Sequence, residues 1–126
     1  MSHSFTNDRP IYLQLMEMIE RDIASGVLPP GSRMPSVRDL ASQIGISPNT
    51  VQRAMYEMER SGLLVSRGTE GKTITEDAGR IAQMRIDLAG QTIERYFSAM
   101  RQLGFEDGES ARLAGSFASG SEQKEG

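Results

Sequence analysis

Two helix starts that lie close together constrain this chain more than any other feature. Ser36 and Ser47 stand where helices would be capped, and Pro48 takes the first helical position after the second serine. Between them, Gly45 suits the end of the first helix. The spacing therefore predicts two short helices joined by a turn around Gly45 and Ile46, which is typical of a helix-turn-helix.

The apolar residues of these two helices recur at helical spacing, so each helix has one face to bury. The first helix carries Val37, Leu40, Ala41 and Ile44 on that face, and the second carries Val51, Ala54, Met55 and Met58 before it ends near Ser61 and Gly62.

The flanking segments predict a winged helix. Residues 11–25 repeat apolar residues at helical spacing and indicate a helix that precedes the pair. Residues 63–67 and 72–75 read as two short strands joined by a turn over 68–71. We therefore expect a mainly helical α+β fold, with a winged helix-turn-helix over residues 1–75.

Several short motifs follow one another over residues 10–74 without a gap. They read Pro10-Ile11-Tyr12-x-Gln14-Leu15, Gly26-x-Leu28-x-Pro30-Gly31, Met34-Pro35-Ser36-Val37-Arg38-x-Leu40-Ala41, Gly45-Ile46-Ser47-x-Asn49-Thr50-Val51-x-Arg53-Ala54 and Glu59-x-x-Gly62-Leu63-Leu64. In this order they resemble the DNA-binding domain of the GntR family of bacterial transcription regulators. The resemblance implies a sequence-specific DNA-binding regulator, most simply a repressor that acts as a dimer at an inverted-repeat operator.

The second helix of a helix-turn-helix presents its first residues to base edges in the major groove. The residues that its buried face leaves for the groove are Ser47, Pro48, Asn49, Thr50, Gln52 and Arg53. Asparagine and glutamine can pair with adenine, and arginine with guanine. The resemblance adds Arg38 as a DNA contact. It also places Gln52 where the family often has arginine, which we interpret as a shift of preference from guanine toward adenine.

The wing supplies two further candidates, Arg67 and Lys72, as contacts to the DNA backbone. Ser36 is expected to combine its capping role with a DNA contact. The family's wing often reads Arg-Gln-Gly-x-Gly-Thr, whereas residues 67–72 read Arg-Gly-Thr-Glu-Gly-Lys. The acid at Glu70 argues against close approach of the wing tip to phosphate.

Three of these residues have a second interpretation. Arg53 lies four positions before Glu57, so it could pair with that acid on the helix surface instead of meeting DNA. Tyr12 could contact a phosphate, but we favour packing against the helix that starts at Ser36. Asn49 could be a tolerated surface residue.

Residues 76–126 predict two more helices. The first has an apolar stripe of Ile81, Met84, Leu88, Ile93, Tyr96, Phe97, Met100 and Leu103. Gly90 interrupts that helix without having to break it, and Gly104 is expected to end it. A final helix is expected over 109–117, followed by a frayed polar tail over 119–126.

This stripe could fold back on the winged helix or pair with a second copy of the chain. Operators are usually inverted repeats, and a two-fold dimer matches that symmetry. We therefore interpret residues 76–126 as an antiparallel two-helix dimerisation segment. Such a short tail resembles the YtrA subfamily, whose members often lie beside transporter genes, which implies control of transport or envelope-stress genes.

Composition argues against catalysis. The chain has no cysteine and a single histidine, His3, which we expect to be neither ligand nor catalyst. It has no glycine-rich phosphate loop, so neither an enzyme nor a metal or other cofactor is expected. No effector can be identified from the sequence.

Charge leaves a competing function open. The net charge is −3, but residues 33–72 carry six basic and four acidic side chains. A winged helix without a strongly basic surface could instead be a protein-interaction module. No apolar run approaches the length of a membrane span and the first residues do not read as a signal peptide, so we expect a cytoplasmic protein.

Overall fold

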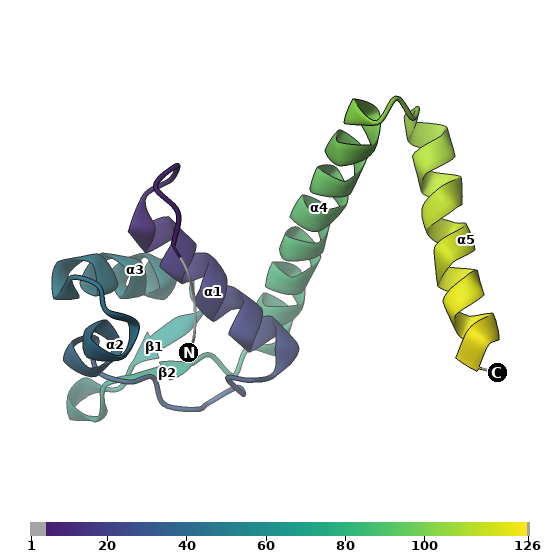
Figure 1. Ribbon diagram of the computed structural model, residues 1–126. Coiled ribbons are helices and arrows are strands. Elements are labelled where there is room, and N and C mark those ends of the chain that lie inside the picture. Colours follow the sequence, from purple (N-terminus) through teal and green to yellow (C-terminus); the bar gives the residue numbers. More distant parts are fainter. Residues whose placement is uncertain (1–4, 126) are drawn as a thin grey trace. The chain divides into compact units, whose positions relative to one another are not determined.

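The computed structural model describes residues 5–125, and His3 lies outside them. Its elements, in chain order, are α1 (Ile11–Ser25), α2 (Val37–Ile44), α3 (Pro48–Arg60), β1 (Leu64–Ser66), the 3-10 turn η1 (Gly68–Glu70), β2 (Lys72–Ile74), α4 (Ala78–Gln102) and α5 (Asp107–Glu125) (Figure 1). The expected winged helix-turn-helix and the mainly helical class are confirmed.

The chain divides into two compact units between Ile86 and Asp87, inside α4. The first unit holds α1 to β2 and the start of α4. The second unit holds the rest of α4 and α5.

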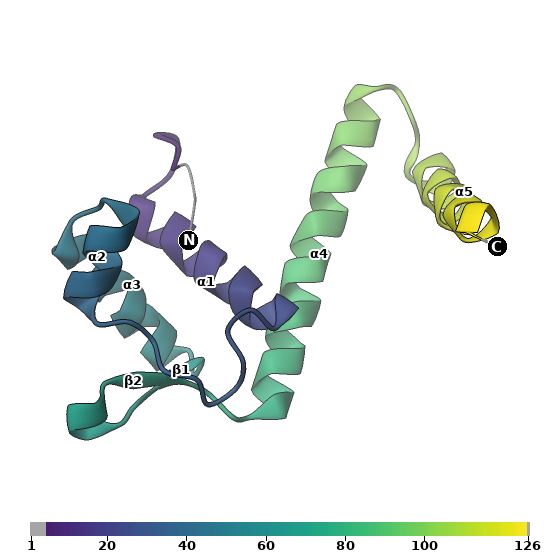
Figure 2. The same ribbon diagram turned by 60° about the horizontal axis from the view of Figure 1, so that its bottom comes forward.

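The helix-turn-helix forms because both of its helices begin at a serine cap. The Ser36 hydroxyl accepts a hydrogen bond from the Asp39 N–H at 3.1 Å, and the Ser47 hydroxyl accepts one from the Asn49 N–H at 3.2 Å. Gly45 ends α2 with a φ of 82°, a left-handed conformation that glycine adopts without steric cost. Within the first unit α3 packs against α1 and α2, and its end packs against β1 (Figures 1 and 2).

The wing is an antiparallel pair in which Leu64 lies opposite Ile74 and Ser66 lies opposite Lys72. The segment before α2 extends this sheet at the other side of β2. Arg33 forms a bridge with Thr73 there, and the Met34 N–H donates to the Lys72 carbonyl at 2.9 Å. No pattern in the sequence predicts this additional pairing, because a single bridge needs no strand-like run of residues.

The core of the first unit is built from the apolar stripes of its helices and the inward residues of the wing. Fully buried side chains include Leu15 and Ile19 from α1, Leu40 from α2, Val51 and Met58 from α3, and Leu63, Leu64 and Ile74 around the wing. The predicted inward faces of the three helices are thus the faces that pack together.

Two features of the C-terminal helices differ from expectation. The last helix begins at Asp107, before position 109, and runs to Glu125, so residues 119–125 are helical where a frayed tail was expected. Gly126 lies outside the described residues. Residues 119–125 contain no proline that would stop a helix, so α5 continues through them. Gly90 leaves α4 unbroken, with only open space where a Cβ would be.

Among the described residues, no helix combines the length and the apolar character needed to cross a bilayer.

Candidate nucleic-acid interface

The start of α3 presents an exposed polar face. Asn49 and Gln52 are exposed and Thr50 is half-buried, whereas Val51 and Ala54 are completely buried. Ser47 and Pro48, in front of them, are also exposed. This alternation follows from the helical period, because the buried positions anchor α3 in the core and turn the others outward. The residues predicted for the groove are therefore outward-facing, as a reading helix requires.

Arg53, one turn further along α3, contacts α1. Its guanidinium carbon lies 3.9 Å from the centroid of the Tyr12 ring, and its Nη2 donates to the Tyr12 hydroxyl at 3.3 Å. The sequence left open a pairing of Arg53 with Glu57, but in the structure Arg53 contacts Tyr12 and Glu57 is paired with Arg60 at 3.5 Å. Tyr12 is half-buried as expected, but it packs on α3 rather than on α2.

The same residues line a depression of about 340 Å³. Its walls are Ile11 and Tyr12 from α1, and Asn49, Thr50 and Arg53 from α3. The fold thus brings three of the predicted groove residues together with the first turn of α1. The sequence predicted Tyr12 only as an alternative phosphate contact and not as a neighbour of Arg53, because the two residues are 41 positions apart and no local pattern links them.

A second depression lies between the start of α2 and the wing. Arg33, Ser36 and Lys72 are among its lining residues, together with Thr69 and Glu70 from the wing turn. Arg33 was not predicted as a site residue, although it lies three positions before the Ser36 cap. Arg38 is exposed on α2 and does not line this depression.

The two basic residues of the wing are both engaged within the protein. The ammonium group of Lys72 is hydrogen-bonded and ion-paired to Glu59 of α3, and lies 3.2 Å from the Ser66 hydroxyl. The Nε of Arg67 donates to the Thr73 hydroxyl at 3.4 Å. Hydrogen bonds from Lys72 and then Ser66 hold the pKa of Glu59 below its usual range. Glu70 is exposed in the wing turn.

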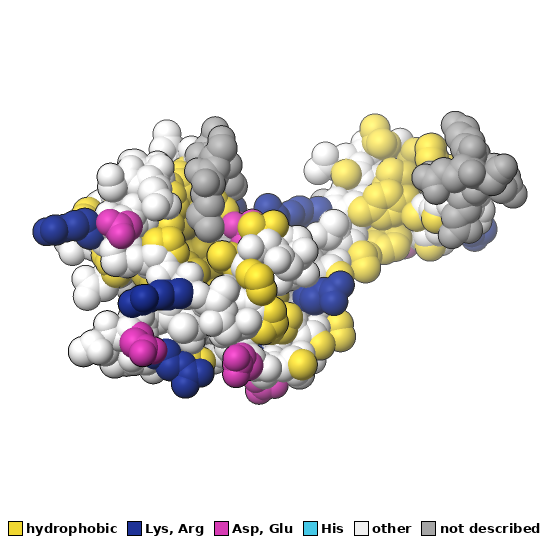
Figure 3. Space-filling view, turned by 90° about the horizontal axis from the view of Figure 1, so that it is seen from below, with side chains coloured by type: hydrophobic (Ala, Val, Ile, Leu, Met, Phe, Trp, Pro, Cys, Tyr) yellow, Lys and Arg dark blue, Asp and Glu magenta, His cyan; other side chains and the backbone are white. Residues whose placement is uncertain are grey.

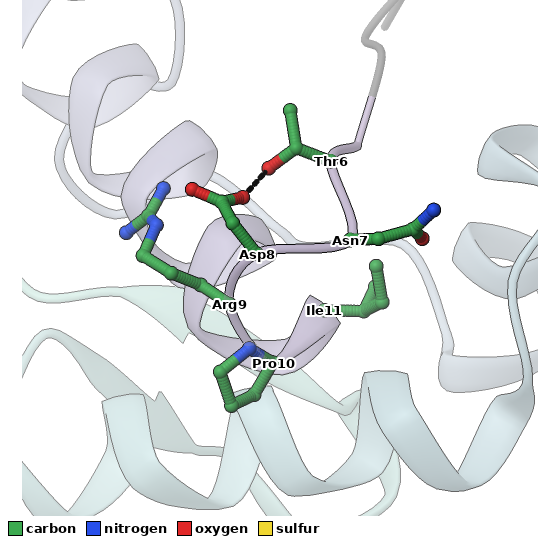
Figure 4. Close-up of a pocket in the computed structure, with 6 residues that line it drawn as sticks. All are labelled: Thr6, Asn7, Asp8, Arg9, Pro10 and Ile11. Carbon is green, nitrogen blue, oxygen red and sulfur yellow. Dashed lines mark hydrogen bonds between the residues drawn. The ribbon is translucent and has the colours of Figure 1, made fainter.

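A buried glutamine fastens the segment that precedes α1. The Gln14 side chain, 4% exposed, donates to the carbonyls of Thr6 and Arg9 at 2.9 and 2.8 Å and accepts from the Thr6 N–H at 2.9 Å. Figure 4 shows Asp8 and Arg9 on one side of this segment, and Asn7 and Ile11 on the other. The hydroxyl of Thr6 is hydrogen-bonded to Asp8, which lowers the pKa of that acid.

The apolar residues predicted for dimerisation divide between the two units. Met84 is 2% exposed and belongs to the core of the first unit, so that part of the stripe folds onto the winged helix. Ile81 and Leu88 are half-buried. In the second unit Tyr96 donates to the Ser110 carbonyl at 2.6 Å and packs edge-on against Phe97.

The second unit also leaves apolar side chains exposed. Ile93 and Leu103 of the predicted stripe are 53% and 72% exposed, while Met100 is nearly buried. Phe105, Leu113 and Phe117 add to the exposed set. Hydrophobic side chains gather on this unit in the space-filling view (Figure 3).

Among the described residues, no group of acidic and histidine side chains is arranged to hold a metal ion. The helix-turn-helix, its outward polar face and the two-stranded wing define a winged-helix DNA-binding protein of the transcription-regulator class. Residues 11–74 match the family model of bacterial regulatory proteins, gntR family. The chain belongs to the GntR family.

Its relatives support that placement. An uncharacterised regulator of Bacillus subtilis, YhcF, is 36% identical over 104 residues, which span 82% of this chain and 86% of the relative. The repressor YtrA of Bacillus subtilis is 31% identical over 97 residues, spanning 72% of this chain and 75% of YtrA.

Two solved structures carry the comparison into three dimensions. A GntR family regulator from Listeria monocytogenes superposes with a TM-score of 0.78 at 35% identity, covering 89% of this chain and 98% of that one. The DNA-binding domain of AraR in complex with its operator ORX1 gives a TM-score of 0.52 at 26% identity, covering 60% of this chain and 92% of that domain.

Proposed function

We propose that this GntR-family regulator is a repressor that binds an inverted-repeat operator as a dimer. The outward polar face at the start of α3 carries the proposal, because Asn49 and Gln52 are exposed on a helix anchored by the buried Val51. The relative YtrA is named a repressor, and the AraR domain of the same fold is described in complex with operator DNA.

Base reading is assigned to Asn49, Thr50 and Gln52, whose amide and hydroxyl groups offer the donors and acceptors that base edges match. Ser47 and Pro48 begin the helix, whose first N–H groups favour a nearby phosphate. Arg38 and Arg67 are exposed and suit the DNA backbone. Lys72 contributes less charge to DNA, because Glu59 already balances it.

Dimerisation is assigned to the second unit. A monomer seldom leaves several large apolar side chains exposed together unless they meet a partner. Ile93, Leu103 and Phe117 are each more than half exposed there. We place the partner face on these residues with Phe97 and Leu113, and not on Met84, which the first unit already buries. Residues 1–75 would thus bind DNA and residues 76–126 would hold the dimer.

The site of action would be the cytoplasm, where bacterial operators lie. Transporter or envelope-stress genes are the proposed targets, by analogy with the resembled subfamily. DNA from upstream of the protein's own gene is accordingly the first duplex to test.

The test is binding to that duplex and to a scrambled duplex of equal length, each at several salt concentrations. A preference for the upstream duplex, with affinity that falls steeply as salt rises, is the expected result, because phosphate contacts release counterions. Arg38→Ala and Asn49→Ala should weaken binding, whereas Val27→Ser, an exposed change outside the site, should not. Equal affinity for both duplexes would point instead to a protein partner for the winged helix.

A further inference from the structure

Tyr12 of α1 and Arg53 of α3 join these two helices at the edge of the outward polar face of α3. The guanidinium carbon of Arg53 lies 3.9 Å from the ring centroid, and one of its N–H groups reaches the phenol oxygen at 3.3 Å. The ring attracts the cation and the hydroxyl accepts a hydrogen bond. Two attachments restrict a long side chain that would otherwise sample many rotamers.

The contact places the guanidinium beside the residues assigned to base reading. Tyr12 and Arg53 line the same depression as Asn49 and Thr50, at the first turns of α1 and α3. Arginine has five N–H donors in one plane, and the bond to Tyr12 uses one of them. The remaining donors can therefore meet an oxygen acceptor of a bound molecule while the ring holds the group in place.

Arg53 is not ion-paired with Glu57, the nearest acid of its own helix. Within the described part of the chain, Glu57 pairs with Arg60 at 3.5 Å rather than with Arg53. Tyrosine holds the guanidinium without neutralising it, whereas a carboxylate would have cancelled the charge that DNA attracts.

We propose that Tyr12 is a positioning residue for DNA recognition, which holds the Arg53 guanidinium so that its free donors meet an oxygen acceptor of the operator. That acceptor is either a backbone phosphate or the edge of a guanine. The inference rests on the proposed operator-binding function. Holding the group in its bound orientation reduces the entropy that binding must otherwise remove.

The experiment is a double-mutant cycle on operator affinity. Tyr12→Ala should weaken binding about two- to fivefold, the range of an exposed cation–π contact. Tyr12→Phe, which keeps the ring, should recover most of that loss. In an Arg53→Met background, Tyr12→Ala should cause no further loss, because a positioning residue acts only through the group it positions.

Arg60→Met combined with Glu57→Gln is the matched control background, because it removes an arginine of the same helix that does not contact Tyr12 and leaves no released carboxylate to pair with Arg53. Tyr12→Ala should weaken binding as much in that background as in the wild type. The salt dependence separates the two acceptors. A phosphate contact predicts that Arg53→Met lowers the salt slope by about one and weakens all duplexes alike, whereas a guanine contact predicts a loss confined to the operator.

Thermal unfolding shows whether Tyr12→Ala still folds, and Tyr12→Phe preserves the test if it does not. An equal loss from Tyr12→Ala with and without Arg53 would overturn the inference, as would unchanged or tighter binding. Tyr12→Phe binding as weakly as Arg53→Met would overturn it as well. If the wild type does not distinguish the operator from a scrambled duplex, the proposed function fails first and the inference with it.

Discussion

The ammonium group of Lys72 on β2 is hydrogen-bonded to one carboxylate oxygen of Glu59 on α3, and the Ser66 hydroxyl on β1 donates to the other at 2.8 Å. One acid thus ties both strands of the wing to α3, the helix proposed to read DNA. The wing is short, with three residues in each strand, and this tie adds to the burial of Leu64 and Ile74 in the core.

Glu59→Gln should loosen the wing and change how stability depends on pH. In the folded protein, hydrogen bonds from Lys72 and Ser66 lower the pKa of Glu59 below its ordinary value of 4.5. The stabilisation is therefore complete above that value and is lost as pH falls through the lowered pKa. Thermal unfolding of both proteins should differ at neutral pH and converge in acid. A difference that stays the same as pH falls from neutral into acid would contradict this account.

The matched control is Glu57→Gln. Glu57 and Arg60 form an i,i+3 pair on the surface of α3, and exposed pairs of this kind contribute about 0.5 kcal/mol or less. This variant should leave wing hydrogen exchange at the wild-type level, whereas Glu59→Gln should accelerate it.

Gly45→Ala and Gly90→Ala should change stability in opposite directions. Gly45 has a φ of 82° and nothing near its Cβ position, so alanine there costs about 1–2 kcal/mol through backbone strain alone. Gly90 lies inside α4 in open space, where alanine should stabilise the helix by about 0.5–1 kcal/mol. Denaturant unfolding measures both, and a destabilising Gly90→Ala would show that the bare backbone there is in contact with something.

Leu15→Ala should destabilise the first unit by about 2–5 kcal/mol, because Leu15 is completely buried in the α1 face of the core. Leu13→Ala on the same helix is the control, since Leu13 is 37% exposed and should cost less than about 1 kcal/mol. Equal losses at both positions would mean that Leu13 is covered in solution.

Phe117→Ser combined with Leu103→Ser should weaken self-association. Both side chains are more than two-thirds exposed in the second unit, so their loss removes apolar area from the proposed partner face. Sedimentation at several concentrations should show a shift toward monomer. Val27→Ser, an equally exposed apolar residue of the first unit, should leave the distribution unchanged.

Gln52→Arg should change which duplex is preferred. Gln52 is exposed on the outward polar face of α3. Arginine pairs with guanine, whereas glutamine pairs with adenine. Selection from a pool of randomised duplexes, followed by sequencing, compares the two proteins. An unchanged preferred sequence would mean that position 52 does not read bases.

Local chemistry made much of the first unit predictable. The caps at Ser36 and Ser47, the left-handed Gly45 and the inward stripes all follow from rules that act over a few residues, and each is confirmed. The 3-10 turn at the wing tip was expected only as a turn. What could not be predicted was pairing across the fold, such as Tyr12 with Arg53.

The same limit explains which contacts around the candidate site could not be predicted. Lys72 was predicted as a contact to the DNA backbone, and its pairing with Glu59 could not be predicted because that acid lies thirteen residues earlier on another element. Gln14 gave no signal as an anchor, because its buried bonds go to backbone carbonyls that any sequence carries. The helical extent of residues 119–125 depends on weak propensities that no motif marks.

The bridge between Arg33 and Thr73 lies at the edge of β2 that faces away from β1. The Gly31 N–H donates to the Ile74 carbonyl and the Ile74 N–H donates to the Ser32 carbonyl, both at 2.8 Å, so the outer side of β2 is already hydrogen-bonded. An unpaired strand edge is a template on which another chain can add a strand and begin a fibre. The segment that leads into α2 takes that place on β2, so this edge is closed to a strand from another chain.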